Sequence, residues 1–169
     1  GSLAQHKGVD RLLPLLARLN RGDDPFRLTV VGDGGRRADL ERRAEREGVR
    51  DAVAFTGWLD NADLPDIFAA HDIFVYPGRW DEPFGRVFLE ALAAGTPVVA
   101  SDVGSVADIV GPGGVTTDGS VDGFADAIRG LVEGGRLAEL SAAAKATVDR
   151  YRAEAVVPQF LELYERARN

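Results

Sequence analysis

The sequence predicts an α/β fold with a doubly wound, mostly parallel sheet and helices on both faces. Short runs of β-branched and aromatic residues alternate with longer amphipathic stretches along the chain. The short runs are mostly apolar, as in strands that a parallel sheet buries on both faces. The connections are short, which is typical of βαβ units. With 169 residues, the chain is long enough for one domain and too short for two.

Five strands are expected, each a run of four to six residues bounded by turn residues. In chain order they occupy residues 26–31, 52–55, 72–76, 97–100 and 114–117. Ligands of such folds bind beyond the carboxyl ends of the strands. The loops that follow the first four strands are therefore where a functional site is expected.

Helices are expected wherever apolar residues recur at three- and four-residue intervals. In chain order they occupy residues 9–19, 36–47, 62–70, 84–94, 124–132, 136–150 and 153–167. Pro14 lies early in the first helix, where its missing amide costs least. Gly95 and Pro97 end the fourth helix. The last two helices follow one another without a strand between them.

Charge and composition exclude several classes of function. The net charge is −7, and the 18 arginines and two lysines are interleaved with acids, so no nucleic-acid-binding face is expected. No apolar run approaches the about 20 residues of a membrane span, so we expect a soluble, cytoplasmic chain. The absence of cysteine excludes zinc–cysteine sites and thiol catalysis, and with only two histidines no metal site is expected. The start Gly1-Ser2, without any methionine, is typical of an excised fragment.

The most informative stretch runs from the third strand into the fourth helix. Glu82 lies in the connecting loop, and Pro83 stands at a position favoured in the first turn of a helix. This predicts free backbone amides at Phe84, Gly85 and Arg86. Such amides, with the positive end of the helix dipole, form an anion-binding site.

Two carboxylates, Glu82 and Glu90, flank this helix start eight residues apart. On a helix, a separation of eight residues is about 12 Å along the axis. The two carboxylates of a glycosidase lie about 5–9.5 Å apart, so this spacing is too long for such a pair. The spacing suits an extended ligand with hydroxyls at both ends and an anion between them, as in a sugar, a diphosphate and a ribose. Two unrelated surface glutamates are the alternative, although the apolar neighbours of Glu90 favour a partner for its carboxylate.

Two weaker signals lie nearer the amino terminus. Gly32 and Gly34 begin a dinucleotide-binding fingerprint, but Arg37 stands where its third glycine belongs, so a tight turn is the alternative. Lys7, one of only two lysines, precedes the first helix and is a candidate phosphate-binding cation. A solvated loop lysine is the alternative there.

Together these residues resemble the carboxyl-terminal, donor-binding domain of a GT-B glycosyltransferase, most closely glycosyltransferase family 4 (group 1). The matching segments are Lys7-Gly8-Val9-Asp10, VVGDG, AFTGWL, the stretch from Glu82 to Ala91, GTPVVASDVG, the GPGGV turn and the final LELYE. The resemblance covers nearly the whole chain. It implies that residues 1–169 are the Rossmann-like, nucleotide-sugar-binding half of a GT-B fold, with the amino-terminal acceptor domain absent.

The resemblance also implies roles for the matching residues. Lys7 matches the diphosphate lysine and Glu82 the glutamate that holds donor-sugar hydroxyls, so both are implied to be catalytic. Glu90 matches the ribose-binding glutamate. The other implied donor contacts are backbone groups at Phe84, Gly85, Arg86 and Val87, and the space for the base beside Trp58 and Leu59, with Gly32 and Gly34 opening room nearby.

The implied reaction is retaining transfer of a hexose from a UDP-, GDP- or ADP-sugar, with electrostatic stabilisation of the leaving diphosphate and no metal or cofactor. The chain alone is expected to bind the donor without efficient turnover, because the acceptor site and any peripheral membrane contact would belong to the missing domain. A sugar-nucleotide epimerase of the same fold and a non-catalytic nucleotide-binding or interaction module are the alternatives. A phosphorylase would need Lys145 for pyridoxal phosphate, and its helix offers no such context.

The chain departs from the family pattern at three places. Ser2 stands where the family has an arginine, which leaves Arg79 or Arg86 as helpers of Lys7. Asp108 replaces a glutamate of the family. The family also has a strand inside the sheet before the lysine loop, and this chain begins where that strand should end.

Overall fold

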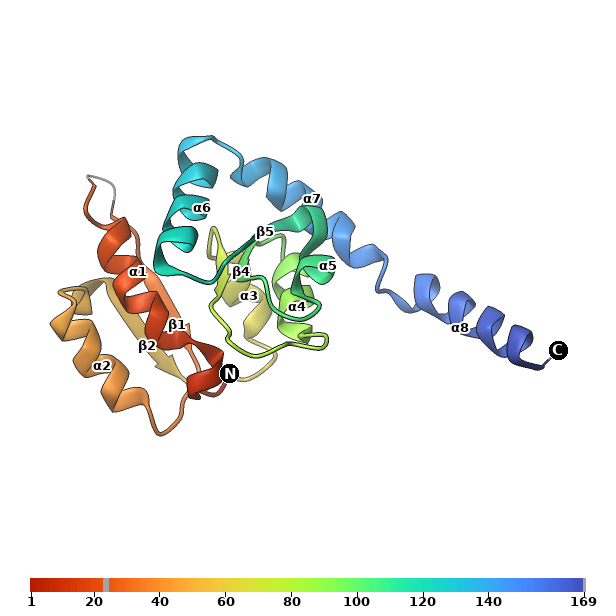
Figure 1. Ribbon diagram of the computed structural model, residues 1–169, viewed down its shortest axis with the longest axis horizontal. Coiled ribbons are helices and arrows are strands. Elements are labelled where there is room, and N and C mark those ends of the chain that lie inside the picture. The colour runs from red at the N-terminus through yellow and green to blue at the C-terminus, as the bar shows by residue number, and fades with distance from the viewer. Residues whose placement is uncertain (23–24, 169) are drawn as a thin grey trace.

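The computed structural model describes residues 1–22 and 25–168 (Figure 1). Within these residues the strands form two parallel groups. One pairs β1 (Leu28–Val31) with β2 (Val53–Gly57), and the other places β4 (Val98–Ser101) between β3 (Phe74–Tyr76) and β5 (Gly114–Thr117). The predicted parallel α/β fold is confirmed, with each strand within two residues of its expected bounds.

The helices follow the expected alternation with one addition. They are α1 (Leu12–Leu19), α2 (Arg37–Arg46), α3 (Leu64–Ala69), α4 (Arg86–Ala93), α5 (Val106–Val110), α6 (Val121–Glu133), α7 (Leu137–Asp149) and α8 (Ala153–Arg168). The helix expected from residue 9 begins as a 3-10 turn over Val9–Arg11. The additional helix, α5, spans five residues, too few for an apolar period to be visible in the sequence.

Helix α1 joins the two strand groups through its apolar residues. Leu12, Leu15 and Leu19 pack in one cluster with Val99 of β4 and with α6. Leu13 and Leu16 pack in a second cluster with Val30 of β1 and with α2. The short helix therefore buries two faces at once, one against each group.

The strands β1 and β3 each keep one edge that pairs with no other strand in residues 1–22 and 25–168. The first residues of the chain lie beside the carboxyl end of β1, where Ser2 pairs in parallel with Asp33. The carbonyl of His6 accepts a 2.8 Å hydrogen bond from the amide of Arg79, which follows β3. Residues 1–6 therefore contact the carboxyl ends of both strand groups.

Helix α8 extends away from the rest of the fold (Figure 1). Five of its large apolar side chains are more than half exposed: Val157, Phe160, Leu161, Leu163 and Tyr164. Among the described residues, no helix has both the length and the apolar character needed to cross a membrane.

Gly8 provides a test of how the first residues are held. Its φ is 70°, and a Cβ there would lie 1.8 Å from the carbonyl oxygen of Pro77. We expect Gly8→Ala to lower the stability by about 3 kcal/mol, through backbone strain and overpacking, and the Tm by about 9 °C. The control Gly130→Ala, in α6 with nothing within 4 Å, should gain about 1 kcal/mol. Calorimetry that found equal effects for the two variants would contradict this description of Gly8.

Candidate functional site

Lys7 is held beside the carboxyl end of β3. The left-handed backbone of Gly8 turns the chain between two 3-10 turns and lies against Pro77, the residue after β3. The Nζ atom of Lys7 lies 3.4 Å from Oε2 of Glu82, a residue 75 positions away in the sequence. It also lies 5.9 Å from the ring centroid of Tyr76. The structure thus brings together the two residues to which the resemblance gives catalytic roles.

Glu82 is fixed by its side chain and by its backbone. The Tyr76 hydroxyl donates a 2.9 Å hydrogen bond to Oε2 of Glu82. Burial raises the pKa of Tyr76, and the adjacent carboxylate of Glu82 raises it further. The carbonyl of Glu82 accepts a 3.1 Å hydrogen bond from the amide of Ser105. The carboxylate is therefore a half-buried acceptor with an ordered position.

The start of α4 lies two residues later than predicted. Gly85, with φ 64°, is the N-cap, and the helix begins at Arg86, so Pro83 lies outside the first turn. The prediction fails because the left-handed conformation of Gly85 interrupts the helical path. The amides of Arg86 and Val87 donate to no backbone carbonyl among the described residues. The start of α4 therefore has amides without a backbone partner, and the predicted amide of Arg86 is one of them; anion binding there stays a prediction.

Phe84 and Val87 both turn their side chains toward the protein. Phe84 is 43% exposed, and its ring packs edge to face on Tyr151 with 5.7 Å between the centroids. Val87 packs against the core around Phe88, while Arg86 is exposed. At Phe84 and Val87, the groups left for a ligand are backbone groups.

Glu90 is exposed on α4, so the expectation that its apolar neighbours demand a partner for it is wrong. Residues adjacent in a helical sequence point about 100° apart, and position 90 faces solvent. Burial lowers the pKa of the Gly1 amine, Lys7 lowers it further, and the charge of Glu90 opposes both.

Gly32 and Gly34 make room for the beginning of the chain. A Cβ at Gly32 would lie 1.7 Å from the carbonyl oxygen of Gly1, and one at Gly34 would lie 3.2 Å from the amide of Leu3. In this structure Gly1 and Leu3 lie beside these glycines, and their role in opening space for a base stays a prediction. Trp58, 69% exposed, lies just beyond β2 with Leu59 beside it.

Asp10 belongs to a matching segment but had no predicted role, and in the structure it binds three arginines. Both of its oxygens accept 2.8 Å hydrogen bonds from Arg79, and Arg36 and Arg43 each approach to 3.6 Å. These bonds, above all the one from Arg79, lower the pKa of Asp10 to about 2. Arg79 is therefore engaged with Asp10, and Arg86 is the more accessible of the two proposed helpers of Lys7. No local sequence pattern predicts this cluster, because Asp10, Arg36, Arg43 and Arg79 are far apart in the sequence.

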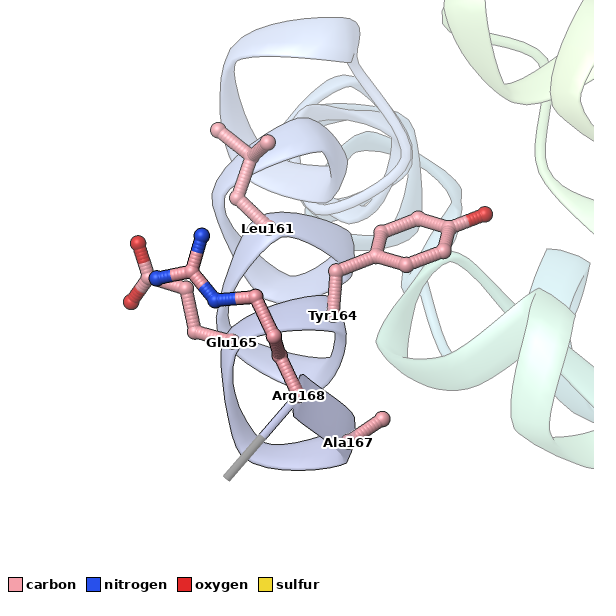
Figure 2. Close-up of a pocket in the computed structure, with 5 residues that line it drawn as sticks. All are labelled: Leu161, Tyr164, Glu165, Ala167 and Arg168. Atoms are coloured by element: carbon pink, nitrogen blue, oxygen red, sulfur yellow. The ribbon is translucent and has the colours of Figure 1, made fainter.

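Other candidate sites are weaker. A hollow of about 440 Å³ is lined by Leu161, Tyr164, Glu165, Ala167 and Arg168. Figure 2 shows that all five side chains project from α8 alone, so the hollow is an open helix surface. In residues 1–22 and 25–168, no three His, Asp or Glu side chains are grouped as metal ligands. Lys145 lies on α7 beside Gly95, beyond the carboxyl end of α4 and away from Glu82.

The parallel fold, with a lysine, a glutamate and a helix start at the carboxyl end of β3, defines an α/β protein with a polar site at one edge of its strands. Residues 1–147 match the family model described as "Glycosyl transferases group 1". The chain therefore belongs to the group 1 glycosyltransferases.

Curated relatives agree with this family. The chain is 33% identical to a 2-deoxystreptamine glucosyltransferase of Streptomyces kanamyceticus, over 98% of this chain and 44% of the relative. It is 40% identical to a GDP-mannose-dependent alpha-mannosyltransferase of Mycolicibacterium smegmatis, over 78% of this chain and 32% of the relative. The chain thus spans less than half the length of these relatives.

Solved structures agree with the fold. HepE of Anabaena in complex with UDP superimposes with a TM-score of 0.85 and 28% identity, over 98% of this chain and 47% of that one. Its complex with UDP-glucose gives a TM-score of 0.82 with the same identity. The fold is that of these solved structures.

The Asp10 cluster leads to a pH-dependent prediction. Replacing Asp10 with Asn leaves three arginines without their shared carboxylate, and we expect a loss of about 2 kcal/mol at pH 7. Because folding lowers the pKa of Asp10 from 3.8 to about 2, its contribution is full above pH 3.8 and disappears as the pH falls toward 2. Urea denaturation of both proteins from pH 7 to pH 2 should show the two stabilities converging below pH 4. The control is Asp126→Asn, at an exposed site on α6, which should change the free energy of unfolding by less than about 0.5 kcal/mol. An equal loss of stability in both variants would refute the role of Asp10.

Proposed function

We propose that this chain is the donor-binding half of a retaining family 4 glycosyltransferase with the GT-B fold. In this proposal it binds a UDP-, GDP- or ADP-hexose, and a separate amino-terminal domain supplies the acceptor site. The observation that carries the proposal is the convergence of Lys7, Glu82 and the open amides of Arg86 and Val87 at one edge of the fold. The binding of UDP and UDP-glucose by the similar HepE structures supports it.

Each group has a chemical task in the proposed site. The positive charge of Lys7 and the amides at the start of α4 stabilise the diphosphate, which gains negative charge as it leaves the sugar. Glu82 accepts hydrogen bonds from sugar hydroxyls and orients the ring. Glu90, about one turn after the start of α4, accepts hydrogen bonds from the ribose. Both tasks use carboxylates as acceptors of charge-assisted hydrogen bonds.

If the donor and acceptor sites belong to different domains, as proposed, the behaviour of residues 1–169 alone can be predicted. Without an acceptor site, it binds donor and turns it over far more slowly than a complete enzyme. Lys7 and the amides supply the positive charge in this proposal, so it calls on no metal ion. The exposed Trp58, beyond β2, lies at the edge where the base is proposed to bind.

Thermal melting tests donor binding directly. A ligand at 100 times its Kd should add about 2.7 kcal/mol, which raises the Tm by about 5–10 °C for a chain of this size. UDP, GDP, ADP and their hexose derivatives are the ligands, and uridine, guanosine and adenosine, which lack the diphosphate, are the controls. The proposal would be refuted if none of the six diphosphate compounds raised the Tm above the value measured with the corresponding nucleoside.

A substitution at Glu90 separates a donor-binding domain from an interaction module. Glu90→Ala should weaken nucleoside diphosphate binding about 10- to 100-fold, because a carboxylate–hydroxyl bond contributes about 1.5–3 kcal/mol. The matched control Glu165→Ala changes an exposed glutamate on α8 and should leave the Kd unchanged. Titration calorimetry measures both. Identical affinities for the two variants would contradict the ribose-binding role of Glu90.

A further inference from the structure

Tyr76 is a buried tyrosine whose ring position is fixed by packing. It ends β3 and is 6% exposed. Its ring meets that of Phe88 edge to face, with 4.8 Å between the centroids and 78° between the planes. Phe88 is itself fully buried in α4. The tyrosine ring is therefore held between the strand and the helix whose start forms the proposed anion site.

Two glycines allow the polar end of this ring to reach the site. A Cβ at Gly78 would lie 2.4 Å from Cε1 and 2.7 Å from the hydroxyl oxygen of Tyr76. A Cβ at Gly85 would lie 2.4 Å from the ring of Phe88 and 3.0 Å from Cγ of Glu82. Any side chain at these positions would displace the tyrosine ring, the phenylalanine ring or the glutamate. The two missing side chains thus let the hydroxyl and the carboxylate meet.

The hydroxyl of Tyr76 and the amine of Lys7 both reach the same oxygen of Glu82. Oε2 accepts from Tyr76 at 2.9 Å and from Lys7 at 3.4 Å. Oε1 has no hydrogen-bond partner among residues 1–22 and 25–168. One oxygen is therefore held by the protein, and the other is left for a ligand.

The two donors to Oε2 differ in freedom of movement. The Lys7 side chain is 37% exposed and reaches Glu82 through a flexible four-carbon chain, so a bound diphosphate can attract its amine. Tyr76 is confined by Phe88 and has only its hydroxyl to offer. When a diphosphate engages Lys7, Tyr76 is the donor that still fixes the carboxylate.

We propose that Tyr76 is a positioning residue, whose hydroxyl holds Oε2 of Glu82 so that Oε1 faces a hydroxyl of the donor sugar. The proposal rests on the proposed function, because it takes Glu82 as the group that binds the sugar. Tyr76 acts through Glu82 and does not touch the nucleotide. Its contribution should therefore appear with nucleotide-sugars and be absent with nucleoside diphosphates.

Paired affinities for one base measure this contribution. For Tyr76→Phe, which removes only the hydroxyl, we expect the Kd of the nucleoside diphosphate to stay within about twofold of the wild-type value. The Kd of the matching nucleotide-sugar should rise about 3- to 10-fold, the effect of one hydrogen bond. The control Tyr164→Phe, at a residue 74% exposed on α8, should change neither Kd. In a Glu82→Ala background, Tyr76→Phe should have no further effect on either.

The outcomes separate this inference from the proposed function. If the wild-type chain binds nucleoside diphosphates and Tyr76→Phe weakens both ligands equally or neither, the positioning role is refuted and the proposed function stands. If the wild-type chain binds no nucleotide, the proposed function fails and the inference fails with it.

A second measurement applies even if Tyr76→Phe does not fold. The sequence has three tyrosines, so a ¹³C label at Cζ gives three assignable signals. Loss of the acceptor in Glu82→Ala should shift the Tyr76 signal and leave that of Tyr164 in place. Addition of nucleotide-sugar to the wild-type chain should shift the Tyr76 signal more than nucleoside diphosphate does. A Tyr76 signal that responds to neither change would overturn the inference.

Discussion

The carboxylate of Asp10 is the polar contact on which the arrangement of the two strand groups most depends. No strand among the described residues pairs with both β1 and β3, so side chains and the backbone of residues 1–6 join the two groups. Arg43 reaches Asp10 from α2, beside β1 and β2, and Arg79 reaches it from the loop after β3. Asp10 itself precedes α1, whose leucines pack on both groups. One acidic residue thus links the two strand groups by ion pairs, next to the helix whose leucines link them by apolar packing.

The candidate site exists because of this junction. Lys7 comes from the segment that Asp10 holds in place, whereas Glu82 comes from the loop that begins with Arg79 and its neighbours. Gly8, pressed against Pro77, keeps the two segments in van der Waals contact. A loosened junction would therefore separate Lys7 from Glu82 before it exposed much of the core. Site geometry and stability depend here on the same few contacts.

The sequence predicted the parts of this molecule that local patterns encode. Strand β5 has the predicted bounds, because its apolar run lies between clear turn residues. The start of α4 was placed two residues early, since a helical period does not reveal the left-handed φ of Gly85. Residues Lys7 and Glu82 were found as motif positions, but their contact was not. The Asp10 cluster and the Tyr76–Glu82 bond are invisible in sequence, because tertiary packing alone brings their members together.

The pairing of Lys7 with Glu82 also constrains how a ligand can enter. A half-buried carboxylate without a partner is costly. For Glu82 both partners, Lys7 and Tyr76, donate to the same oxygen, Oε2. An arriving diphosphate competes for Lys7, so part of its attraction is offset by the loss of this ion pair. The amides of Arg86 and Val87 carry no such cost, since they donate to no backbone carbonyl among the described residues. In the proposed site the start of α4 therefore attracts the anion without breaking an existing ion pair, whereas Lys7 must move its positive charge from Glu82 toward the ligand.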